Sequence, residues 1–380
     1  MDFIKKLLRT YRYRIENRTP LITIRIHKKR IQENLRVFQK RMSGVAVSPV
    51  LKSNAYGHGL LEVARIIDTE EIPFITVDSH FEAQRLRESG IKHSILVLGY
   101  SHDDIIAHTR LPHIAFTIIA IDQLIALKEK NIRARIHLKI DTGMHRQGIL
   151  PSELPHAFKI IHSAPRLDIE GICSHLACAD EEELSMTHAQ ITLWNSLVDM
   201  CKRELPHIQY FHLAQTAGSF FSAGIKANVM RLGLGLYGIT THPSDTIDIK
   251  PALDIYTVIS STKKIHARET VGYNATFTAQ KDMRIATIPL GYAEGLDRRL
   301  SNKGIVRIDS YESPIIGRVS MNITSIDVST IPSAQRNTRV EIVSSNSKNK
   351  NSIVAHAHTA GTIPYVLLVH IPQYLKRIVV

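Results

Sequence analysis

Short apolar runs alternate with longer amphipathic segments along the chain from about residue 28 onward. This alternation is typical of parallel strands that are connected by helices. The candidate strands are eight apolar runs: Val45 to Val50, Ile75 to Val77, Ile95 to Leu98, Ile114 to Thr117, Arg135 to Lys139, Ile169 to Cys173, Phe211 to Leu213 and Met230 to Leu236. The candidate helices include Arg30 to Met42, His80 to Glu88, Ile121 to Lys130 and Thr187 to Arg203. A closed barrel of eight parallel strands is one natural arrangement of this pattern.

The pattern changes after the THPSD stretch at residues 241–245. The β-branched runs that follow are Tyr256 to Ser260, Arg284 to Ile288, Ile305 to Ile308 and Asn322 to Val328. Because β-branched residues favour strands, we expect a mainly β domain over residues 246–380. The polar stretch from Ser344 to Ser352 is typical of an exposed loop.

Composition narrows the class of protein. The 380 residues are 44% hydrophobic and 22% charged, near the average of globular proteins. The formal net charge of +13 could attract nucleic acid or anionic small molecules, but no nucleic-acid-binding motif accompanies it, so we expect no nucleic-acid partner. Cys173, Cys178 and Cys201 have the spacing of neither a disulfide framework nor a zinc site, and we expect reduced thiols and no metal.

The first 18 residues, MDFIKKLLRTYRYRIENR, are basic and partly apolar. They lack the uninterrupted apolar core and the small-residue cleavage site of a secretory signal, so we expect a cytoplasmic protein. An amphipathic segment that lies on a membrane surface remains an alternative for these residues. No run approaches the roughly 20 apolar residues of a membrane span, and we expect no stable span.

The most informative segment is VAVSPVLKSNAYGHGL, residues 45–60. An apolar strand ends there at Lys52, and Tyr56 follows within the next turn. In a parallel barrel, the loops at the carboxyl ends of the strands build the active site. A sheltered lysine can shift its pKa and act as a nucleophile. Lys52 is therefore a candidate catalytic residue, although an ordinary surface lysine is the alternative.

The stretch KSNAYGHG closely resembles the cofactor-lysine motif of alanine racemases. The family's further motifs follow in order: HLKIDTGMHRQG (137–148), SHLACAD (174–180), RLGLGLYG (231–238), VGYNATFTA (271–279), GYAEG (291–295), GRVSMN (317–322) and GTIPY (361–365). The resemblance covers nearly the whole chain. It implies a TIM-like α/β barrel of eight parallel strands over residues 28–245, followed by a mainly β C-terminal domain over 246–380. Residues 1–27 would be an N-terminal extension with a strand near Leu21 to Ile26 that packs with the C-terminal domain.

The same resemblance implies that the cofactor is pyridoxal 5'-phosphate (PLP), carried by Lys52. The cofactor-binding residues that it implies are Lys52, Tyr56, His175, Thr216, Arg231, Gly233, Leu234 and Tyr365. Hydroxyls donate to phosphate oxygens, and a glycine lets the backbone approach closely. Arg231 would face the pyridine nitrogen. Because an arginine does not give up its proton, that nitrogen should stay unprotonated, which disfavours side reactions such as transamination.

Racemisation needs an acid/base group on each face of Cα. By resemblance, Lys52 serves the D-face and Tyr273, in VGYNATF, serves the L-face. A free tyrosine has a pKa near 10 and needs a positive environment to act near neutrality. The resemblance supplies one through a hydrogen-bond chain from Tyr273 by way of His175 to Arg231.

The resemblance also implies a substrate site. Arg146 and the backbone amide of Met321 would bind the substrate carboxylate, and Tyr292 would restrict large side chains at the narrow entrance. Lys139 occupies a position that is carbamylated in some members of the family, and an ordinary buried, ion-paired lysine is the alternative.

Several positions depart from the family pattern. Gln215 and Thr216 stand where an Asn-Ser pair is expected. Asn274 replaces a common Gly, Glu294 replaces Asp, and Asn322 replaces Asp. The HIPQY tail at 370–374 lacks both arginines of the usual RxPR ending. None of these changes removes Lys52 or Tyr273.

We therefore expect interconversion of L- and D-alanine, supplying D-alanine for peptidoglycan, in a homodimer whose active sites are shared between subunits. A racemase of another amino acid, such as serine, lysine or arginine, is the nearest alternative. A decarboxylase or aldolase on the same type of barrel is less compatible with Tyr273 and Arg231. The departures also leave open a PLP-binding protein without racemase activity.

Overall fold

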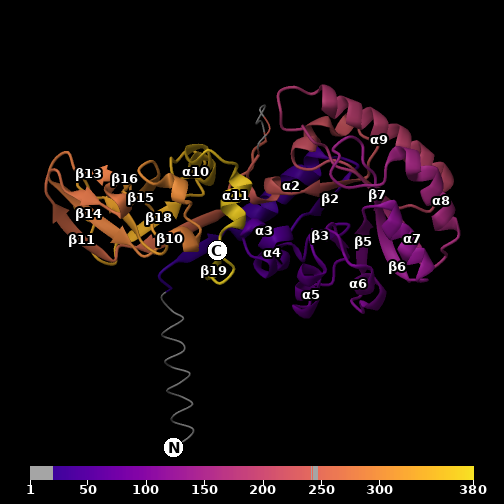
Figure 1. Cartoon of the computed structure of the whole chain (residues 1–380), viewed down its shortest axis with the longest axis horizontal. Coiled ribbons are helices and arrows are strands. Elements are labelled where there is room, and N and C mark those ends of the chain that lie inside the picture. The colour runs from indigo at the N-terminus through magenta and orange to yellow at the C-terminus, as the bar shows by residue number, and fades with distance from the viewer. Residues whose placement is uncertain (1–19, 241, 243–246) are drawn as a thin grey trace, which may run out of the picture. The chain divides into compact units, whose positions relative to one another are not determined.

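The computed structural model describes residues 20–240, 242 and 247–380 (Figure 1). They form two compact units. One unit spans Lys28–Lys250, and the other combines the chain up to His27 with Pro251–Val380. The domain boundary expected at residue 245 falls among residues outside the described ranges.

Parallel strands form the core of the first unit. They are β2 (Ala46–Pro49), β3 (Ile75–Val77), β4 (Ile95–Val97), β5 (Ile114–Ile118), β6 (Ala134–Lys139), β7 (Leu167–Cys173), β8 (Tyr210–His212) and β9 (Val229–Leu232). Strands β3 to β8 pair in chain order, and β2 pairs in parallel with β9. These eight strands correspond to the eight apolar runs of the sequence.

Two further sets of contacts close the ring of strands. Val50, just after β2, bridges in parallel to Thr76 of β3. The amide of Arg231 in β9 donates to the carbonyl of Ala214, just beyond β8, at 3.0 Å. The order therefore runs from β2 through β8 to β9 and back to β2. The predicted α/β barrel is confirmed.

Helices cover the outside of this barrel (Figure 1). They are α2 (Lys28–Arg41), α4 (Leu60–Ile67), α5 (His80–Glu88), α6 (Asp103–His108), α7 (Ile121–Glu129), α8 (Leu154–His162) and α9 (Ser185–Glu204). In α2 the buried residues are Ile31, Asn34, Leu35 and Phe38, spaced three and four apart on one face. The four helices expected from the sequence are confirmed to within two residues at each end.

One expected strand is wrong at its carboxyl end. The run from Met230 to Leu236 is a strand only as far as Leu232, and Leu234–Tyr237 forms a 3-10 turn, η3. The backbone of Gly233 (φ −90°, ψ −111°) leaves the strand conformation, so the ladder stops there. This break brings the backbone of residues 233–235 to the mouth of the barrel.

The second unit is built on one nine-stranded sheet, ordered β11-β14-β17-β16-β15-β18-β10-β1-β19. Its strands are β1 (Thr23–Ile26), β10 (Leu253–Val258), β11 (Ser261–Ile265), β14 (Met283–Ile288), β15 (Ile305–Ile308), β16 (Tyr311–Ile316), β17 (Thr324–Asp327), β18 (Arg339–Val343) and β19 (Arg377–Val379). Strands β12 (Thr270–Val271) and β13 (Phe277–Thr278) form a separate pair. The expected mainly β C-terminal domain is confirmed.

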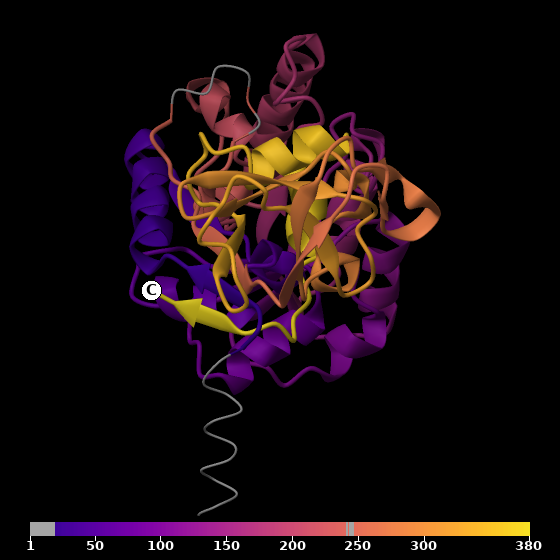
Figure 2. The same cartoon turned by 90° about the vertical axis from the view of Figure 1, so that its left-hand side faces the viewer.

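The N-terminal strand joins this sheet, as expected. Strand β1 pairs antiparallel with β10 and parallel with β19. Strand β19 is the yellow arrow that ends at the C-terminus in Figure 2. Both ends of the described chain are therefore strands of the same sheet.

The sequence did not predict two short helices of this unit, α10 (Ile353–Ala360) and α11 (Pro364–Val369). The expectation of an exposed loop from Ser344 to Ser352 is also wrong at its ends. Asn351 is buried and its side-chain amide donates to the carbonyl of Glu341 at 3.1 Å. The buried Ser352 hydroxyl accepts from the amide of Ala355 and so caps α10.

The basic segment of residues 1–18, for which a membrane-surface role was one alternative, lies outside the described residues. Within the described ranges, no helix is long and apolar enough to cross a bilayer. The cysteines Cys173, Cys178 and Cys201 are all free thiols.

Candidate active site

Lys52 lies at the carboxyl end of β2 and begins the short segment α3 (Lys52–Tyr56). Residues 53–56 have positive φ angles of 53°, 57°, 52° and 49°. A left-handed backbone costs non-glycine residues about 1–2 kcal/mol each. Strain of this kind persists only where surrounding contacts hold it, and it concentrates at functional sites. The strained turn therefore makes Lys52 and Tyr56 candidates for a functional role.

Hydrogen bonds hold this left-handed turn. The amide of Ala55 donates to the carbonyl of Leu51 at 2.8 Å. The amide of Asn54 donates to the carboxylate of Glu82 at 3.2 Å, and the Asn54 side-chain oxygen accepts from the amide of Leu60 at 2.9 Å. The turn is thus tied both to β2 and to the helices that follow it.

Tyr56 and Thr216 are buried and face the backbone of Gly233. A Cβ on Gly233 would lie 3.1 Å from the Tyr56 hydroxyl and 3.8 Å from the Thr216 hydroxyl. The Thr216 hydroxyl also accepts from the amide of Gly235 at 3.2 Å. The amides of Gly233 and Leu234 donate to no described residue. Two hydroxyls thus lie near the backbone of Gly233, in a space that a side chain at position 233 would narrow, and the amides of Gly233 and Leu234 next to it have no described acceptor.

Arg231 is buried inside the barrel, and its guanidinium is fixed by acceptors from β7, β8 and the residues after them. One terminal nitrogen donates to the carbonyl and Nδ1 of His212. The other donates to the carbonyls of Ser174 and Leu213 at 2.6 and 3.1 Å, and lies 3.3 Å from Nδ1 of His175. None of these bonds uses Nε, which leaves one N–H without a partner among the described residues.

The guanidinium of Arg231 determines the tautomers of two buried histidines. An arginine can only donate, so Nδ1 of His212 must accept and its proton sits on Nε2. That Nε2 lies 2.8 Å from Nδ1 of His137, whose own proton must then sit on Nε2. The latter atom lies 3.9 Å from the carboxylate of Glu170, which forms an ion pair with Arg135. A fixed chain of polar side chains therefore crosses the barrel interior.

His137 and His212, the two histidines of this hydrogen-bonded chain of side chains, are neutral at ordinary pH. Burial, assisted by the charges of Arg231 and Arg135, lowers the pKa of His137 to about 3. Burial and then the charge of Arg231 lower the pKa of His212 well below its usual value. Burial also lowers the pKa of Arg231 itself. Neutral imidazoles keep a lone pair for hydrogen bonding, so they satisfy the arginine without adding charge.

The mouth of the barrel is strongly cationic. The pKa of His175 is held well below its usual value by burial first and then by the charges of Arg231, Arg146, Lys139 and Lys52. All four cations are near enough to act on this one imidazole. A site of this kind attracts anionic groups such as phosphate and carboxylate.

Lys139 ends β6 within this cationic group. Burial is the main cause that lowers its pKa, and the nearby charges of Arg146, Arg231 and Lys52 lower it further. Lys139 has no ion pair with a described residue. A lowered pKa leaves more of the neutral amine that carbamylation requires, and that modification stays a prediction.

The remaining predicted site residues belong to the second unit. Tyr273, Tyr292 and Met321 are 66%, 43% and 57% exposed. Tyr365 is half-buried in α11. Their expected meeting with the barrel residues, including the link from Tyr273 to His175, stays a prediction.

The structure accounts for one departure from the family pattern and leaves another open. Asn274 has a positive φ of 60°, a conformation that asparagine tolerates better than most residues, which explains how it can replace glycine. The side-chain amide of Gln215 donates to the carbonyl of Leu176 at 3.3 Å. Its side-chain oxygen is buried and has no partner in the described part of the chain.

Sequence reasoning missed three residues that support this site. His212 accepts from Arg231, and His137 is bonded in turn to His212. Tyr237 is fully buried, and its hydroxyl donates to the carbonyl of Val50 at 2.8 Å. For the two histidines, the available signal was a polar residue inside a strand that is buried in the barrel. Such a residue must find a partner in a barrel interior, but the sequence does not say which one. Tyr237 lies in the turn η3 and gave no such signal.

Comparison with known proteins agrees with this geometry. The family model for the alanine racemase N-terminal domain matches residues 26–241, and the model for the C-terminal domain matches residues 252–379. The alanine racemase of Sorangium cellulosum is 31% identical over 364 residues, which cover 91% of this chain and 96% of that protein.

Solved structures share the fold. The crystal structure of alanine racemase from Bacillus anthracis with bound L-Ala-P is 29% identical and superposes with a TM-score of 0.86, covering 95% of each chain. The alanine racemase from Bartonella henselae with covalently bound pyridoxal phosphate has a TM-score of 0.85 at 24% identity, covering 95% of this chain and 100% of that one.

A parallel barrel with a lysine at a strand end, joined to a β-rich unit, defines the class. Within that class, this chain belongs to the alanine racemase family. The resemblance recognised in the sequence motifs is thereby confirmed.

The neutral histidine chain predicts a particular dependence of stability on pH. His137 is neutral when folded but titrates near pH 6.5 when unfolded, so the unfolded state binds more protons below that pH. The free energy of unfolding should therefore fall as pH drops from about 6.5 toward 3, by up to about 1.4 kcal/mol per pH unit for each such group. His137→Asn should flatten this slope by about one proton, measured by denaturant unfolding between pH 7 and 4.

His207→Asn is the matched control, because His207 is exposed. Its slope should equal that of the unmodified protein. An unchanged slope in His137→Asn would contradict the neutral buried state of His137.

Proposed function

We propose that this chain is an alanine racemase that interconverts L- and D-alanine with PLP held on Lys52. The observation that carries the proposal is that three features lie at one end of the barrel. They are Lys52 on a strained turn, a candidate anion site at Gly233, and the buried Arg231, whose Nε–H has no partner among the described residues. PLP needs a covalent anchor, a site for its phosphate and a partner for its ring nitrogen, and these three features would supply them. Membership of the alanine racemase family supports assigning all three to PLP.

The residues at the barrel mouth fit PLP in three ways. The hydroxyls of Tyr56 and Thr216 and the amides of Gly233 and Leu234 would hold the phosphate. The Nε–H of Arg231 would donate to the pyridine nitrogen. The amine of Lys52 has no hydrogen bond or ion pair to a described residue, and it would hold the cofactor covalently.

When bound, PLP supplies an electron-withdrawing ring that acidifies the Cα proton of an amino acid. Arg231 limits that effect because it keeps the ring nitrogen unprotonated. Its fixed position depends on the acceptors from Ser174, His212 and Leu213. A weaker electron sink favours rapid return of the proton over side reactions.

Two side chains would move the proton. Lys52 would hold or release it on the D-face of Cα, and Tyr273 would do so on the L-face. The neutral His175 faces Arg231 with its Nδ1, so its proton sits on Nε2, and that N–H would donate to the Tyr273 hydroxyl oxygen in the racemase. This contact ties the tyrosine to a cationic environment, which favours its ionised form.

The substrate would be held by its carboxylate. Arg146 is exposed at the barrel mouth and has no ion pair in the described chain, so its guanidinium is available to bind a carboxylate. The Met321 amide would add a second donor. A carbamylated Lys139 would orient Arg146, and Tyr292 would limit the side chain that can enter.

We expect the second base to come from the partner subunit of a homodimer with shared sites. Tyr273, Tyr292 and Met321 are large side chains that stay exposed on the second unit, as expected for residues that a partner subunit covers. In an isologous dimer they would complete the barrel mouth of the other subunit. A cytoplasmic enzyme that supplies D-alanine for peptidoglycan agrees with this activity.

The direct test is racemisation by the purified protein supplied with PLP. We expect conversion of L- to D-alanine and of D- to L-alanine, with serine and lysine turned over far more slowly. Polarimetry or chiral chromatography measures it. Bound cofactor without turnover would favour a noncatalytic PLP-binding protein, and a preference for serine or lysine would favour a different racemase.

Tyr273→Phe tests the base on the L-face. The change removes one exposed hydroxyl, so folding and PLP content should be retained while turnover falls about a hundred- to ten-thousand-fold. Exchange of the α-hydrogen in deuterated water should be lost chiefly from L-alanine. Equal exchange from both enantiomers at the normal rate would reject the role of Tyr273.

Mixing Lys52→Ala protein with Tyr273→Phe protein tests the shared site. Each variant alone should be nearly inactive, whereas a mixed dimer has one site with both bases intact. Random exchange of equal amounts should restore about a quarter of the original sites. Failure to recover activity, despite subunit exchange seen by mass spectrometry, would contradict the shared-site geometry.

A further inference from the structure

Three departures from the family pattern meet at one place in the second unit. Two loops, residues 290–296 and 319–323, carry Tyr292 and Met321. We refer to them as the entrance loops. Glu294 and Asn322 belong to these loops, and Tyr374 of the altered HIPQY tail contacts one of them. Because Glu294, Asn322 and Tyr374 all contact the entrance loops, we consider the three positions together.

Backbone contacts hold the two entrance loops in a fixed register. The amide of Tyr292 donates to the carbonyl of Ser320 at 3.1 Å, and the amide of Ala293 donates to the carbonyl of Met321 at 2.9 Å. Gly291 makes this approach possible, because a Cβ there would lie 2.1 Å from the carbonyl oxygen of Ser320. A displacement of either loop would therefore move both Tyr292 and Met321.

The Glu294 carboxylate connects the two loops, because one of its oxygens is bonded to each loop. One accepts from the side-chain amide of Asn322 at 2.6 Å. The other accepts from the backbone amide of Gly291 at 2.9 Å. The pairing needs a donor at position 322. An aspartate there would face Glu294 with a second carboxylate, and the two negative charges would repel each other.

Tyr374 adds a third connection from the C-terminal tail. Its hydroxyl donates to the carbonyl of Ala293 at 3.1 Å, in the loop that carries Tyr292. The tail is thus anchored to the entrance loop by a tyrosine, in a segment where the family usually has arginines.

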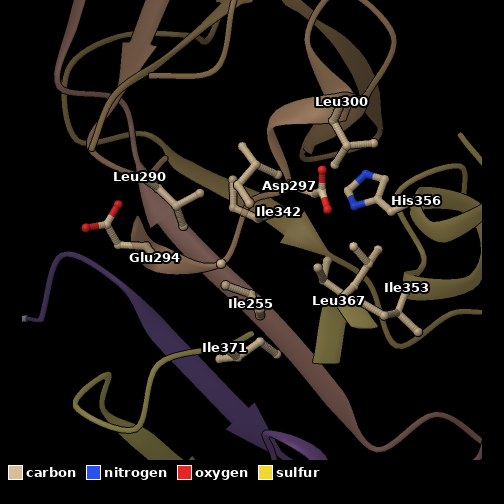
Figure 3. A pocket seen from close by; sticks show the side chains of 13 residues that line it. Ile255, Leu290, Glu294, Asp297, Leu300, Ile342, Ile353, His356, Leu367 and Ile371 are labelled. Carbon is tan, nitrogen blue, oxygen red and sulfur yellow. The ribbon is translucent and has the colours of Figure 1, made fainter. Parts of the chain in front are cut away.

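Packing beneath the first loop is incomplete. A small cavity of about 20 Å³ lies there, lined mainly by apolar side chains that include Leu290, Ile255 and Ile371, with Glu294 at its edge (Figure 3). A void gives the loop fewer contacts on that side. The position of the loop therefore depends more on its polar connections to Asn322 and Tyr374.

We propose that Glu294, Asn322 and Tyr374 are positioning residues that set the placement of Tyr292 and Met321. They thereby control alanine affinity and the rejection of larger amino acids at the entrance. The assignment of that entrance rests on the proposed racemase function. In this chain Glu294 and Asn322 act as a pair, in which the longer carboxylate on one loop accepts from the side-chain amide on the other.

The test is a reciprocal exchange of the pair. Asn322→Asp puts two carboxylates in contact, which should separate the loops and raise the KM for alanine about tenfold at pH 9, with a smaller change in kcat. Adding Glu294→Gln should restore KM to within about threefold, since the glutamine amide can donate to the new aspartate.

Selectivity gives a second activity readout. The ratio of kcat/KM for alanine to that for serine should fall in Asn322→Asp and recover in the double variant. Tyr374→Phe removes a single oxygen and should raise KM about two- to threefold. Asn337→Asp is the matched control: it adds the same charge at an exposed position of the same unit and should change neither quantity.

Hydrogen exchange separates this proposal from the function on which it rests. Backbone amides of residues 290–296 and 319–323 should exchange faster in Asn322→Asp and return to the original rates in the double variant, whether or not alanine is turned over. Faster exchange in Asn322→Asp, in a protein that racemises no alanine, would overturn the proposed function and the role of the loops at a substrate entrance. The contact between Glu294 and Asn322 would still be supported. Unchanged exchange and KM at pH 9, or no recovery in the double variant, would overturn the positioning role.

Discussion

The candidate site at the mouth of the barrel depends on the burial of the Arg231 guanidinium. Removing a charged group from water is costly unless hydrogen bonds replace its hydration. Arg231 meets this requirement with backbone carbonyls and neutral histidines, and no described carboxylate is among its bonded partners. These acceptors come from the ends of β7 and β8 and the residues after them. The contacts of Arg231 therefore depend on the parallel register of β7, β8 and β9.

Several properties of the site follow from this arrangement. The guanidinium fixes the tautomers of His212 and His137, and its charge helps to keep the pKa of both below the ordinary range. It also lowers the pKa of His175 and Lys139. A single buried cation thus influences the protonation of its neighbours, and its Nε–H, which has no partner among the described residues, is the group that we propose for the ring nitrogen. The electronic properties proposed for the bound cofactor are a consequence of barrel packing.

Much of the fold could be predicted from the sequence because it is encoded by local pattern. Apolar runs predicted the strands of the barrel, and amphipathic segments predicted helices such as α2. The predicted end of β9 was too late in the sequence, because the backbone conformation of Gly233 ends the strand at Leu232. The short helices α10 and α11 lie in a β-rich context and have little local signal.

The site was predictable where motifs encode it, and incompletely so where contacts are distant in sequence. Lys52 and Arg231 were named from motifs, yet the left-handed turn after Lys52 is held by contacts with Leu51, Leu60 and the more distant Glu82. The pairing of His137 with His212 spans 75 residues and leaves no local pattern. The same holds for Glu294 and Asn322, which were noted as separate departures and became one feature only in three dimensions.

The most direct measurement of the central claim is the protonation state of the cofactor's ring nitrogen. The protein would be loaded with PLP labelled with ¹⁵N in the pyridine ring and studied by solid-state NMR near neutral pH. The account predicts the chemical shift of an unprotonated, hydrogen-bonded pyridine nitrogen, because Arg231 donates and does not give up its proton. The shift of a protonated pyridinium would contradict it.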